Sequence, residues 1–134
     1  MAAGNVDFVL ADTSIWVDHL RRGNVPGFAD LLVHDQILLS PYVELELLCG
    51  TRNRNERTFL RKHFQGVRGP EISARPGDAS QLVEEHSLGG SGLSAIDVLL
   101  LQEATVNRAA LWTRDRALHK AATDLGCVYR VTLP

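Results

Sequence analysis

Short apolar runs alternate along the chain with longer segments whose apolar residues recur every three or four positions. The short runs have the length and composition of buried strands and predict strands at residues 6–11, 36–39, 110–113 and 127–131. The longer segments predict helices at residues 13–22, 28–33, 41–50, 53–65, 78–87, 94–107 and 115–125. Because strands that alternate with helices form parallel sheets covered on both faces, we predict an α/β fold, a three-layer α/β/α sandwich with a mainly parallel central sheet.

Glycine and proline interrupt this pattern at two places. Residues 66–77 predict a loop that contains a short strand at 71–73. Residues 89–92, Gly-Gly-Ser-Gly, break the chain before the helix that begins at 94. With 134 residues and a hydrophobic fraction of 45%, the chain can bury one compact core, so residues 1–134 are expected to form a single domain.

The chain carries no pattern typical of a membrane or secreted protein. Its apolar runs are far shorter than the roughly 20 residues that a membrane span needs, and the N-terminus has no charged segment followed by an apolar core and a cleavage site. We therefore expect a cytoplasmic protein. Cys49 and Cys127 show no metal-binding spacing and are interpreted as reduced, isolated thiols in the core. The five histidines show no paired metal spacing either.

Positive charge is concentrated in two regions, although the formal net charge is −2. Between positions 52 and 75 the acids are Glu56 and Glu71, against seven basic residues, namely Arg52, Arg54, Arg57, Arg61, Lys62, Arg68 and Arg75. A second cluster comprises Arg108, Arg114, Arg116 and Lys120. In the helix at 53–65, Phe59, Leu60 and Phe64 are expected to face inward, which leaves a cationic outer face.

Four acidic side chains are the candidates for chemistry. Asp12 follows the first predicted strand directly, and Asp115 follows the strand at 110–113 closely, so both belong to the edge where ligand sites form in α/β sheets. Asp97 at the start of one helix and Glu46 on another are the acids best placed to join them. A cluster of like charges needs a cation, and Mg²⁺ or Mn²⁺ prefers carboxylate oxygens. We therefore predict a divalent metal site.

Each acid also has a structural alternative. Asp12 is placed to cap the following helix, and Ser94 with Asp97 has the spacing of a capping box. Glu46 fits an exposed helical position, and Asp115 fits a first-turn acid beside the helix dipole. None of these residues decides the matter alone.

Four short motifs, in order, resemble those of PIN-domain nucleases, in particular the VapC-type toxins of bacterial toxin-antitoxin pairs. Residues 10–17 (LADTSIWV) resemble the opening strand-to-helix motif, with Asp12 as a metal ligand. Residues 46–50 (ELLCG) match an E-L-x-x-G motif, which selects Glu46 over Glu44. Residues 93–100 (LSAIDVLL) are similar to the third motif. Residues 111–116 (LWTRDR) contain the T-x-D segment that is the family's fourth and last motif. The resemblance covers nearly the whole chain.

The resemblance implies a function as well as a fold. It implies a metal-dependent endoribonuclease in which Asp12, Asp97 and Asp115 hold one or two Mg²⁺ ions, with Glu46 contributing directly or through water. A metal-activated water would attack the phosphorus and leave a 5'-phosphate and a 3'-hydroxyl. It further implies a homodimer that a small antitoxin protein silences by covering the acidic pocket. The Gly-rich residues 89–92 depart from the family pattern and put the substrate preference in doubt.

Two further groups of residues are assigned supporting roles. Thr13, Ser14 and Thr113 are expected to fix waters or orient the acids, with helix capping as the alternative for Ser14. The RNA backbone is expected to contact the basic residues, namely Arg52, Arg54, Arg57, Arg61, Arg114 and Arg116. For the helix at 53–65, the alternative is a solvated cationic face that binds nothing.

Two rival functions remain open from the sequence. A Mg²⁺-dependent phosphohydrolase would use Asp12 as a nucleophile, but such enzymes usually carry a second acid two positions later, where this chain has Ser14. A catalytically silent module would keep the fold and bind RNA or an antitoxin without cutting. The presence of all four acids argues against such a loss of catalytic activity.

Overall fold

A small parallel sheet forms the centre of the protein, whose computed structural model describes residues 8–131. Strand β1 (Val9–Ala11) lies between β2 (Ile37–Leu38) and β3 (Ala110–Trp112), and both pairings are parallel. Every residue of these strands is buried. Such fully apolar strands are typical of a sheet covered on both faces. The predicted start of the first strand at Val6 lies outside the described residues.

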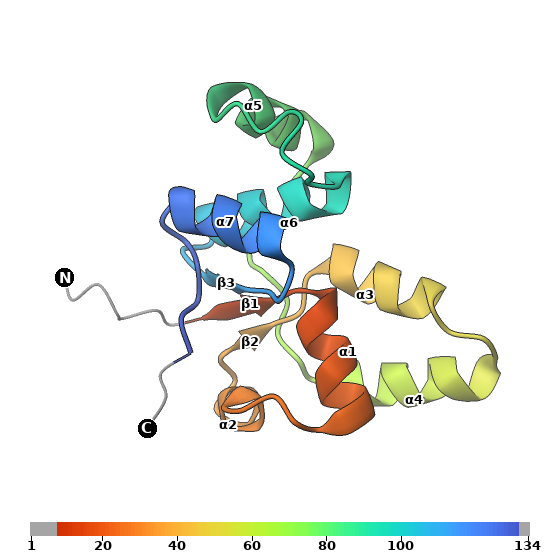
Figure 1. The fold of residues 1–134 in the computed structure, drawn as a ribbon. Coiled ribbons are helices and arrows are strands. Elements are labelled where there is room, and N and C mark those ends of the chain that lie inside the picture. The colour runs from red at the N-terminus through yellow and green to blue at the C-terminus, as the bar shows by residue number, and fades with distance from the viewer. Residues whose placement is uncertain (1–7, 132–134) are drawn as a thin grey trace.

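Helices cover both faces of this sheet, which confirms the predicted three-layer α/β/α arrangement (Figure 1). Helices α6 (Ala95–Val106) and α7 (Arg116–Asp124) lie on one face, and α1 (Thr13–Arg22) and α2 (Phe28–Val33) lie on the other. Helices α3 (Pro41–Cys49) and α4 (Arg54–Phe64) extend beyond the ends of the strands, whereas α5 (Pro76–Glu85) packs against the outside of α6. Among the described residues, no helix is long and apolar enough to cross a membrane.

Buried aliphatic and aromatic side chains form one continuous core. On the face covered by α1, the ring of Trp16 meets Phe28 edge-on with centroids 5.0 Å apart and meets Phe64 at 5.4 Å. These aromatic contacts tie α1 to α2 and α4 and bury the apolar side of each helix.

The predicted inward face of α4 is wrong for one residue. Leu60 and Phe64, four positions apart, are buried, but the side chain of Phe59 is 48% exposed. Residues 59 and 60 point about 100° apart around a helix, so a single narrow stripe cannot bury both of them with Phe64. Phe59 instead packs beside the ring of His63, with centroids 4.2 Å apart.

The predicted short strand at residues 71–73 does not form. Its backbone is hydrogen-bonded to side chains instead of a neighbouring strand: Ile72 N donates to Asn107 Oδ1 at 2.9 Å, and Asn107 Nδ2 donates to Ile72 O at 2.7 Å. The segment therefore lies against α6 as a strap, which we define as residues 72–74.

The predicted last strand at 127–131 is reduced to a single parallel bridge between Leu111 and Val128. Leu111 N donates to Cys127 O at 2.6 Å, and Tyr129 N donates to Leu111 O at 2.8 Å. Arg130 and Val131 are exposed, so the apolar packing that would hold a longer edge strand ends there.

The cysteines are both free thiols, as predicted, but the core position is wrong for Cys49. Cys49 is exposed at the end of α3, because it lies two residues, or about 200° of helix rotation, beyond the buried Leu47. Cys127 is partly buried, and this burial raises the pKa of its thiol.

Candidate active site

Asp12 lies at the point where β1 ends and α1 begins. Its backbone N–H donates to Trp112 O at 2.9 Å, which continues the pairing of β1 with β3 by one residue. Its carboxylate caps α1, accepting from Ile15 N at 3.2 Å and from Ser14 Oγ at 2.5 Å. Asp12 therefore caps α1, as the structural alternative predicted. The residue is only 6% exposed.

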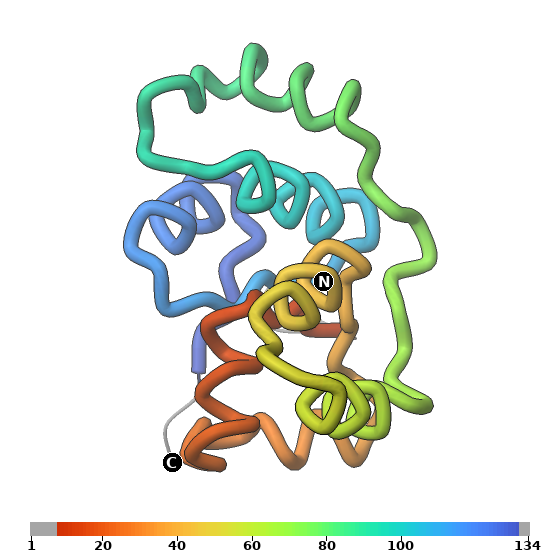
Figure 2. The backbone as a smooth tube through the Cα atoms, turned by 90° about the vertical axis from the view of Figure 1, so that its right-hand side faces the viewer, coloured from red at the N-terminus to blue at the C-terminus, as the bar shows by residue number. Residues whose placement is uncertain are grey.

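Thr113 connects Asp12 to Asp115. The Thr113 hydroxyl donates to the second carboxylate oxygen of Asp12 and accepts from Asp115 N at 3.0 Å. Asp115 Oδ1 in turn accepts from Leu118 N at 2.9 Å and caps α7. The Arg114 backbone N–H also donates to Ser14 Oγ at 3.2 Å. The segments that follow β1 and β3 are thus joined by hydrogen bonds at the same edge of the sheet, the edge that faces the viewer in Figure 2.

Glu46 approaches this edge from α3. Its Oε1 atom accepts a hydrogen bond of 2.7 Å from Oγ1 of Thr13, the residue after Asp12. Glu46 is exposed, as we predicted for an ordinary helical glutamate at this position. Thr13 therefore orients an otherwise solvated carboxylate toward the end of β1.

Asp97 occupies the third position of α6 and completes a capping box with Ser94. Ser94 N donates to Asp97 Oδ2 at 2.9 Å, and Asp97 N donates to Ser94 Oγ at 3.1 Å. Within residues 8–131, no hydrogen bond joins the Asp97 side chain to the other three acids. Helix α6 nevertheless packs against both α7 and α3, which carry Asp115 on the preceding loop and Glu46.

The electrostatics of the site are dominated by the burial of Asp12. Desolvation raises the pKa of its carboxyl, although hydrogen bonds from Ser14, Thr113 and Ile15 act in the opposite direction. Across the described part of the chain, none of the four acids takes part in an ion pair. A buried carboxylate that no basic side chain neutralises is costly unless a ligand supplies positive charge.

The residues present fit a hydrated hard cation better than a closed metal cage. In the described part of the chain, no three side chains of histidine, cysteine, aspartate or glutamate lie close enough together to form a metal site. Mg²⁺, however, usually keeps several waters and needs only one or two carboxylates. Asp115 Oδ2 and Glu46 Oε2 accept no hydrogen bond from residues 8–131, so each retains an oxygen for such a role. The convergence of all four acids on one metal stays a prediction.

Some of the basic residues are exposed, and others form ion pairs with acidic side chains. Arg54, Arg57 and Arg61 are exposed along α4, and Arg116 is exposed at the start of α7. Arg52 pairs with Glu56 at 3.6 Å. Arg114 donates to Asp18 Oδ2 at 2.6 Å, so its guanidinium is committed to fixing the loop after β3 against α1. The exposed face of α4 is the stronger candidate for RNA contact.

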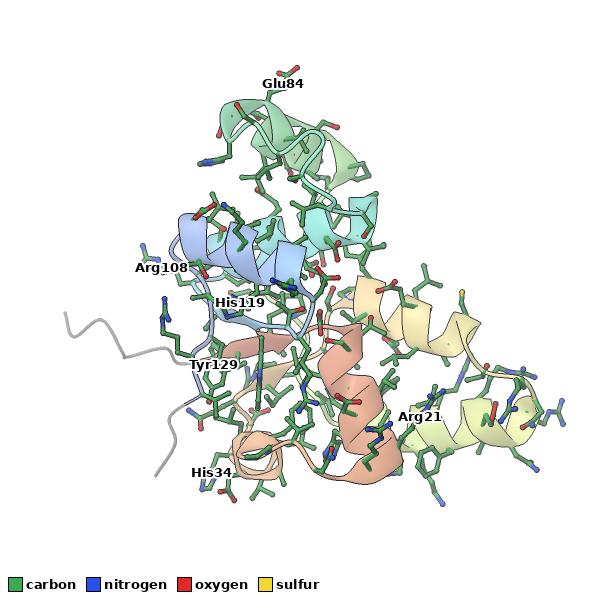
Figure 3. All side chains as sticks on the ribbon, viewed as in Figure 1. Arg21, His34, Glu84, Arg108, His119 and Tyr129 are labelled. Carbon is green, nitrogen blue, oxygen red and sulfur yellow. The ribbon has the colours of Figure 1, made fainter. Side chains whose placement is uncertain are left out.

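A cleft of about 340 Å³ opens next to Glu46 between α1, α3 and α4. Thr13 and Glu46 form one end of it, and Phe59 and Leu60 contribute apolar surface. Arg21, labelled in Figure 3, extends from α1 beside α4 and lines the same cleft. The site thus continues into an apolar groove with charged residues at its edge.

One buried acid, Glu103, is not among the candidates predicted from the sequence. Glu103 on α6 is 0% exposed and contacts residues of two other segments. Its signal was a lone Glu at residue 103 on the same helical face as Leu99 and Leu100, within an otherwise apolar run.

Comparison with known proteins gives one clear sequence relationship. The chain is 33% identical over 121 residues to Ribonuclease VapC32 of Mycobacterium tuberculosis, and the same match is found in strains CDC 1551 and H37Rv. The matched region covers 88% of this chain and 93% of the relative. No protein-family model matches the sequence.

Solved structures share the fold. FitAcB from Neisseria gonorrhoeae superposes with a TM-score of 0.64 at 20% identity, covering 87% of this chain and 94% of that chain. PAE2754 from Pyrobaculum aerophilum gives 0.57 at 15% identity, with 84% and 78% covered. FitAB bound to an IR36 DNA fragment gives 0.63 at 19% identity, with 87% and 91% covered.

Proposed function

The chain belongs to the VapC family of PIN-domain ribonucleases, and we propose that it is a Mg²⁺-dependent endoribonuclease that acts as the toxin of a toxin-antitoxin pair. One observation carries the proposal of a metal-dependent site. Asp12 is buried at the end of β1 with no basic side chain of the described residues paired to it, while hydrogen bonds through Thr113 and Thr13 connect its surroundings to Asp115 and Glu46.

Asp12, Asp97 and Asp115 are the residues that would hold Mg²⁺ or Mn²⁺, and Glu46 would add a direct or water-mediated contact. The cation would stabilise the negative charge that builds on the phosphate and make a water molecule more acidic. Oxygen from water then bonds to phosphorus, the bond from phosphorus to the 3' oxygen breaks, and that oxygen takes up a proton. The products are a 5'-phosphate and a 3'-hydroxyl.

The hydroxyl side chains keep the acids in position for this step. Ser14 and Thr113 donate to the two oxygens of Asp12, and Thr13 donates to Glu46. Hydrogen bonds from such neighbouring groups fix the direction in which a ligand oxygen points. The rival phosphohydrolase, in which Asp12 would attack a phosphate itself, is disfavoured because such enzymes usually carry a second acid two positions later, where this chain has Ser14.

RNA would be held by cationic side chains near the site. Arg54, Arg57 and Arg61 present exposed charges along α4, which borders the cleft beside Glu46. Contacts of this type attract phosphates without reading sequence and weaken as salt increases. An RNA substrate agrees with the cytoplasmic location predicted from the sequence.

We also expect a protein partner that covers the site. The cleft between α1, α3 and α4 joins the Thr13 and Glu46 pair to apolar surface at Phe59 and Leu60. A small antitoxin that places apolar side chains in this cleft would block access to the acids. The homodimer implied by the family resemblance stays a prediction.

The test is cleavage of a structured, 5'-labelled RNA by purified, partner-free protein over a series of Mg²⁺ concentrations. We expect Asp12→Asn to lower kcat/KM by at least about a hundredfold, because it removes a metal ligand and not merely the support of one. Cleaved RNA should carry 5'-phosphates that permit ligation.

Asp30→Asn is the matched control, since it removes one exposed carboxylate from α2 without touching the site. It should cleave like the wild type. Equal cleavage by the wild type and Asp12→Asn would reject the proposed site. Absence of cleavage by both, with RNA still bound, would favour the catalytically silent module.

A further inference from the structure

Glu103 is a fully buried carboxyl in the middle of α6, outside the group of acids assigned to catalysis. It is 0% exposed and lies six residues after Asp97 on the same helix. Burial raises the pKa of its carboxyl, and within residues 8–131 it forms no ion pair. An apolar residue of similar size would avoid this desolvation cost, so the carboxyl has to be explained by what it contacts.

One oxygen of Glu103 contacts the start of α3. Ser40 Oγ donates to Glu103 Oε1 at 2.5 Å. Ser40 is itself 0% exposed and is the N-cap of α3, accepting from Tyr42 N at 3.2 Å. Glu103 therefore anchors the first turn of the helix that carries Glu46.

The other oxygen of Glu103 contacts the strap, residues 72–74. Ala74 N donates to Glu103 Oε2 at 3.2 Å, and the Tyr42 hydroxyl donates to Ala74 O. One carboxyl thus joins α6, α3 and the strap in a closed hydrogen-bond circuit that runs through Tyr42. Networks of this kind specify one arrangement of the elements that they connect.

We infer that Glu103 is a positioning residue, which sets the helix carrying Glu46 against the helix carrying Asp97 and so fixes the spacing of these two acids. This inference rests on the proposed metal-dependent cleavage of RNA. It assigns Glu103 no contact with the substrate or the cation.

The geometry explains why these two acids need an external anchor. Glu46 lies six residues after Ser40, and Asp97 lies six residues before Glu103, so each acid is about 9 Å along its helix from the junction. Asp12 and Asp115 are tied to adjacent strands, whereas Glu46 is bonded to Thr13 alone and Asp97 to Ser94 alone among the described residues. A small rotation at the junction therefore moves these two acids relative to the others. Displacement of reacting groups by about 1 Å can cost roughly a hundredfold in rate.

The test compares Glu103→Leu with Glu103→Gln in the full-length protein, measuring kcat, KM for RNA and the Mg²⁺ concentration at half-maximal rate. Glu103→Leu should lower kcat by roughly ten- to a hundredfold and raise the Mg²⁺ half-saturation, with KM changed by less than about twofold. Glu103→Gln can still accept from Ala74 N and bond to Ser40, and should stay within about threefold of the wild type.

Mg²⁺ binding also stabilises the fold, so the half-saturation is compared at a temperature at which circular dichroism shows every variant to be folded without Mg²⁺. Under that condition a shift in the half-saturation reports positioning and not destabilisation. Leu82→Ala, which removes buried volume between α5 and α6, is the control for stability and should leave the half-saturation unchanged. If Glu103→Leu does not fold, Ser40→Ala tests the same junction from α3 and should raise the half-saturation to a smaller extent.

Wild-type kcat and Mg²⁺ half-saturation in Glu103→Leu, with Asp12→Asn inactive, would overturn this inference and leave the proposed function standing. A Glu103→Gln variant as impaired as Glu103→Leu would also overturn it, because charge and not hydrogen bonding would then be required. Wild-type cleavage by Asp12→Asn would reject the proposed function itself.

Discussion

Two regions of the molecule each bury a carboxyl group, but the hydrogen-bond donors to the two carboxyls come from different parts of the fold. At the edge of the sheet, Asp12 receives its hydrogen bonds from Ser14 and Ile15 in the first turn of α1 and from Thr113 just after β3. Inside the molecule, Glu103 is 0% exposed and receives its hydrogen bonds from two distant segments. Burial raises the pKa of both carboxyls. The difference teaches that a buried carboxyl in this fold can cap a helix at the edge of the sheet, where the proposed ligand site lies, or join helices in the interior.

After the loss expected for Asp12→Asn, the largest effect concerns the hydroxyl partners of Asp12 and tests whether they matter for catalysis. Thr113→Val keeps the shape of the side chain but removes the donor to Asp12 and the acceptor for Asp115 N. We expect kcat/KM for RNA cleavage to fall by roughly ten- to a hundredfold, as for other groups that orient metal ligands. Thr113→Ser restores the hydroxyl and should recover most of this loss. A fully active Thr113→Val would mean that Asp12 needs no such support.

A smaller effect tests which buried carboxyl meets a cation. At ten times its dissociation constant, Mg²⁺ should stabilise the wild type by about 1.4 kcal/mol, which corresponds to a rise of several degrees in melting temperature. Glu103→Gln should show the same rise, whereas Asp12→Asn should show little or none. Thermal unfolding with and without Mg²⁺ measures this directly. An equal rise in Asp12→Asn would place the cation elsewhere.

The smallest effect concerns pH without metal. The pKa of Asp12 is raised from its ordinary value of 3.8 in the folded state, so the folded protein binds more protons than the unfolded chain above that value. The free energy of unfolding of the wild type should therefore fall as pH rises above this value. Asp12→Asn should lack the part of this decrease that the Asp12 carboxyl causes. In urea unfolding with EDTA, from about pH 4 to about pH 8, the stability of Asp12→Asn relative to the wild type should increase with pH.

Asp30→Asn is the control for this measurement, since its carboxylate is exposed and its removal should produce no such trend. Addition of Mg²⁺ should reduce the advantage of Asp12→Asn, because the cation stabilises the ionised Asp12. A constant difference between Asp12→Asn and the wild type at all pH values would contradict the role assigned to burial.

The sequence was most informative where local pattern and overall topology agree. The apolar runs before Asp12 and before Thr113 form adjacent parallel strands, so the edge position of both residues follows from the alternation of strands and helices. The capping alternatives for Asp12 and Asp97 were also visible in the sequence, because capping depends on residues only two or three positions away.

Contacts between distant segments could not be predicted in this way. The pattern predicts a strand at residues 71–73, but the backbone of the overlapping strap bonds to the side chains of Asn107, Glu103 and Tyr42, which no local pattern identifies. Arg114 looked like a free charge and is engaged by Asp18, 96 positions away. Likewise, nothing next to Glu103 in the sequence reveals that Ser40 lies against it.

The three candidate aspartates have one feature in common: each accepts a hydrogen bond from a backbone N–H group at the start of a different helix, namely α1, α6 and α7. Their side-chain rotamers are therefore set before any ligand arrives, which lowers the entropy cost of binding. It also means that a ligand drawing these oxygens inward would pull on the first turns of three helices at once.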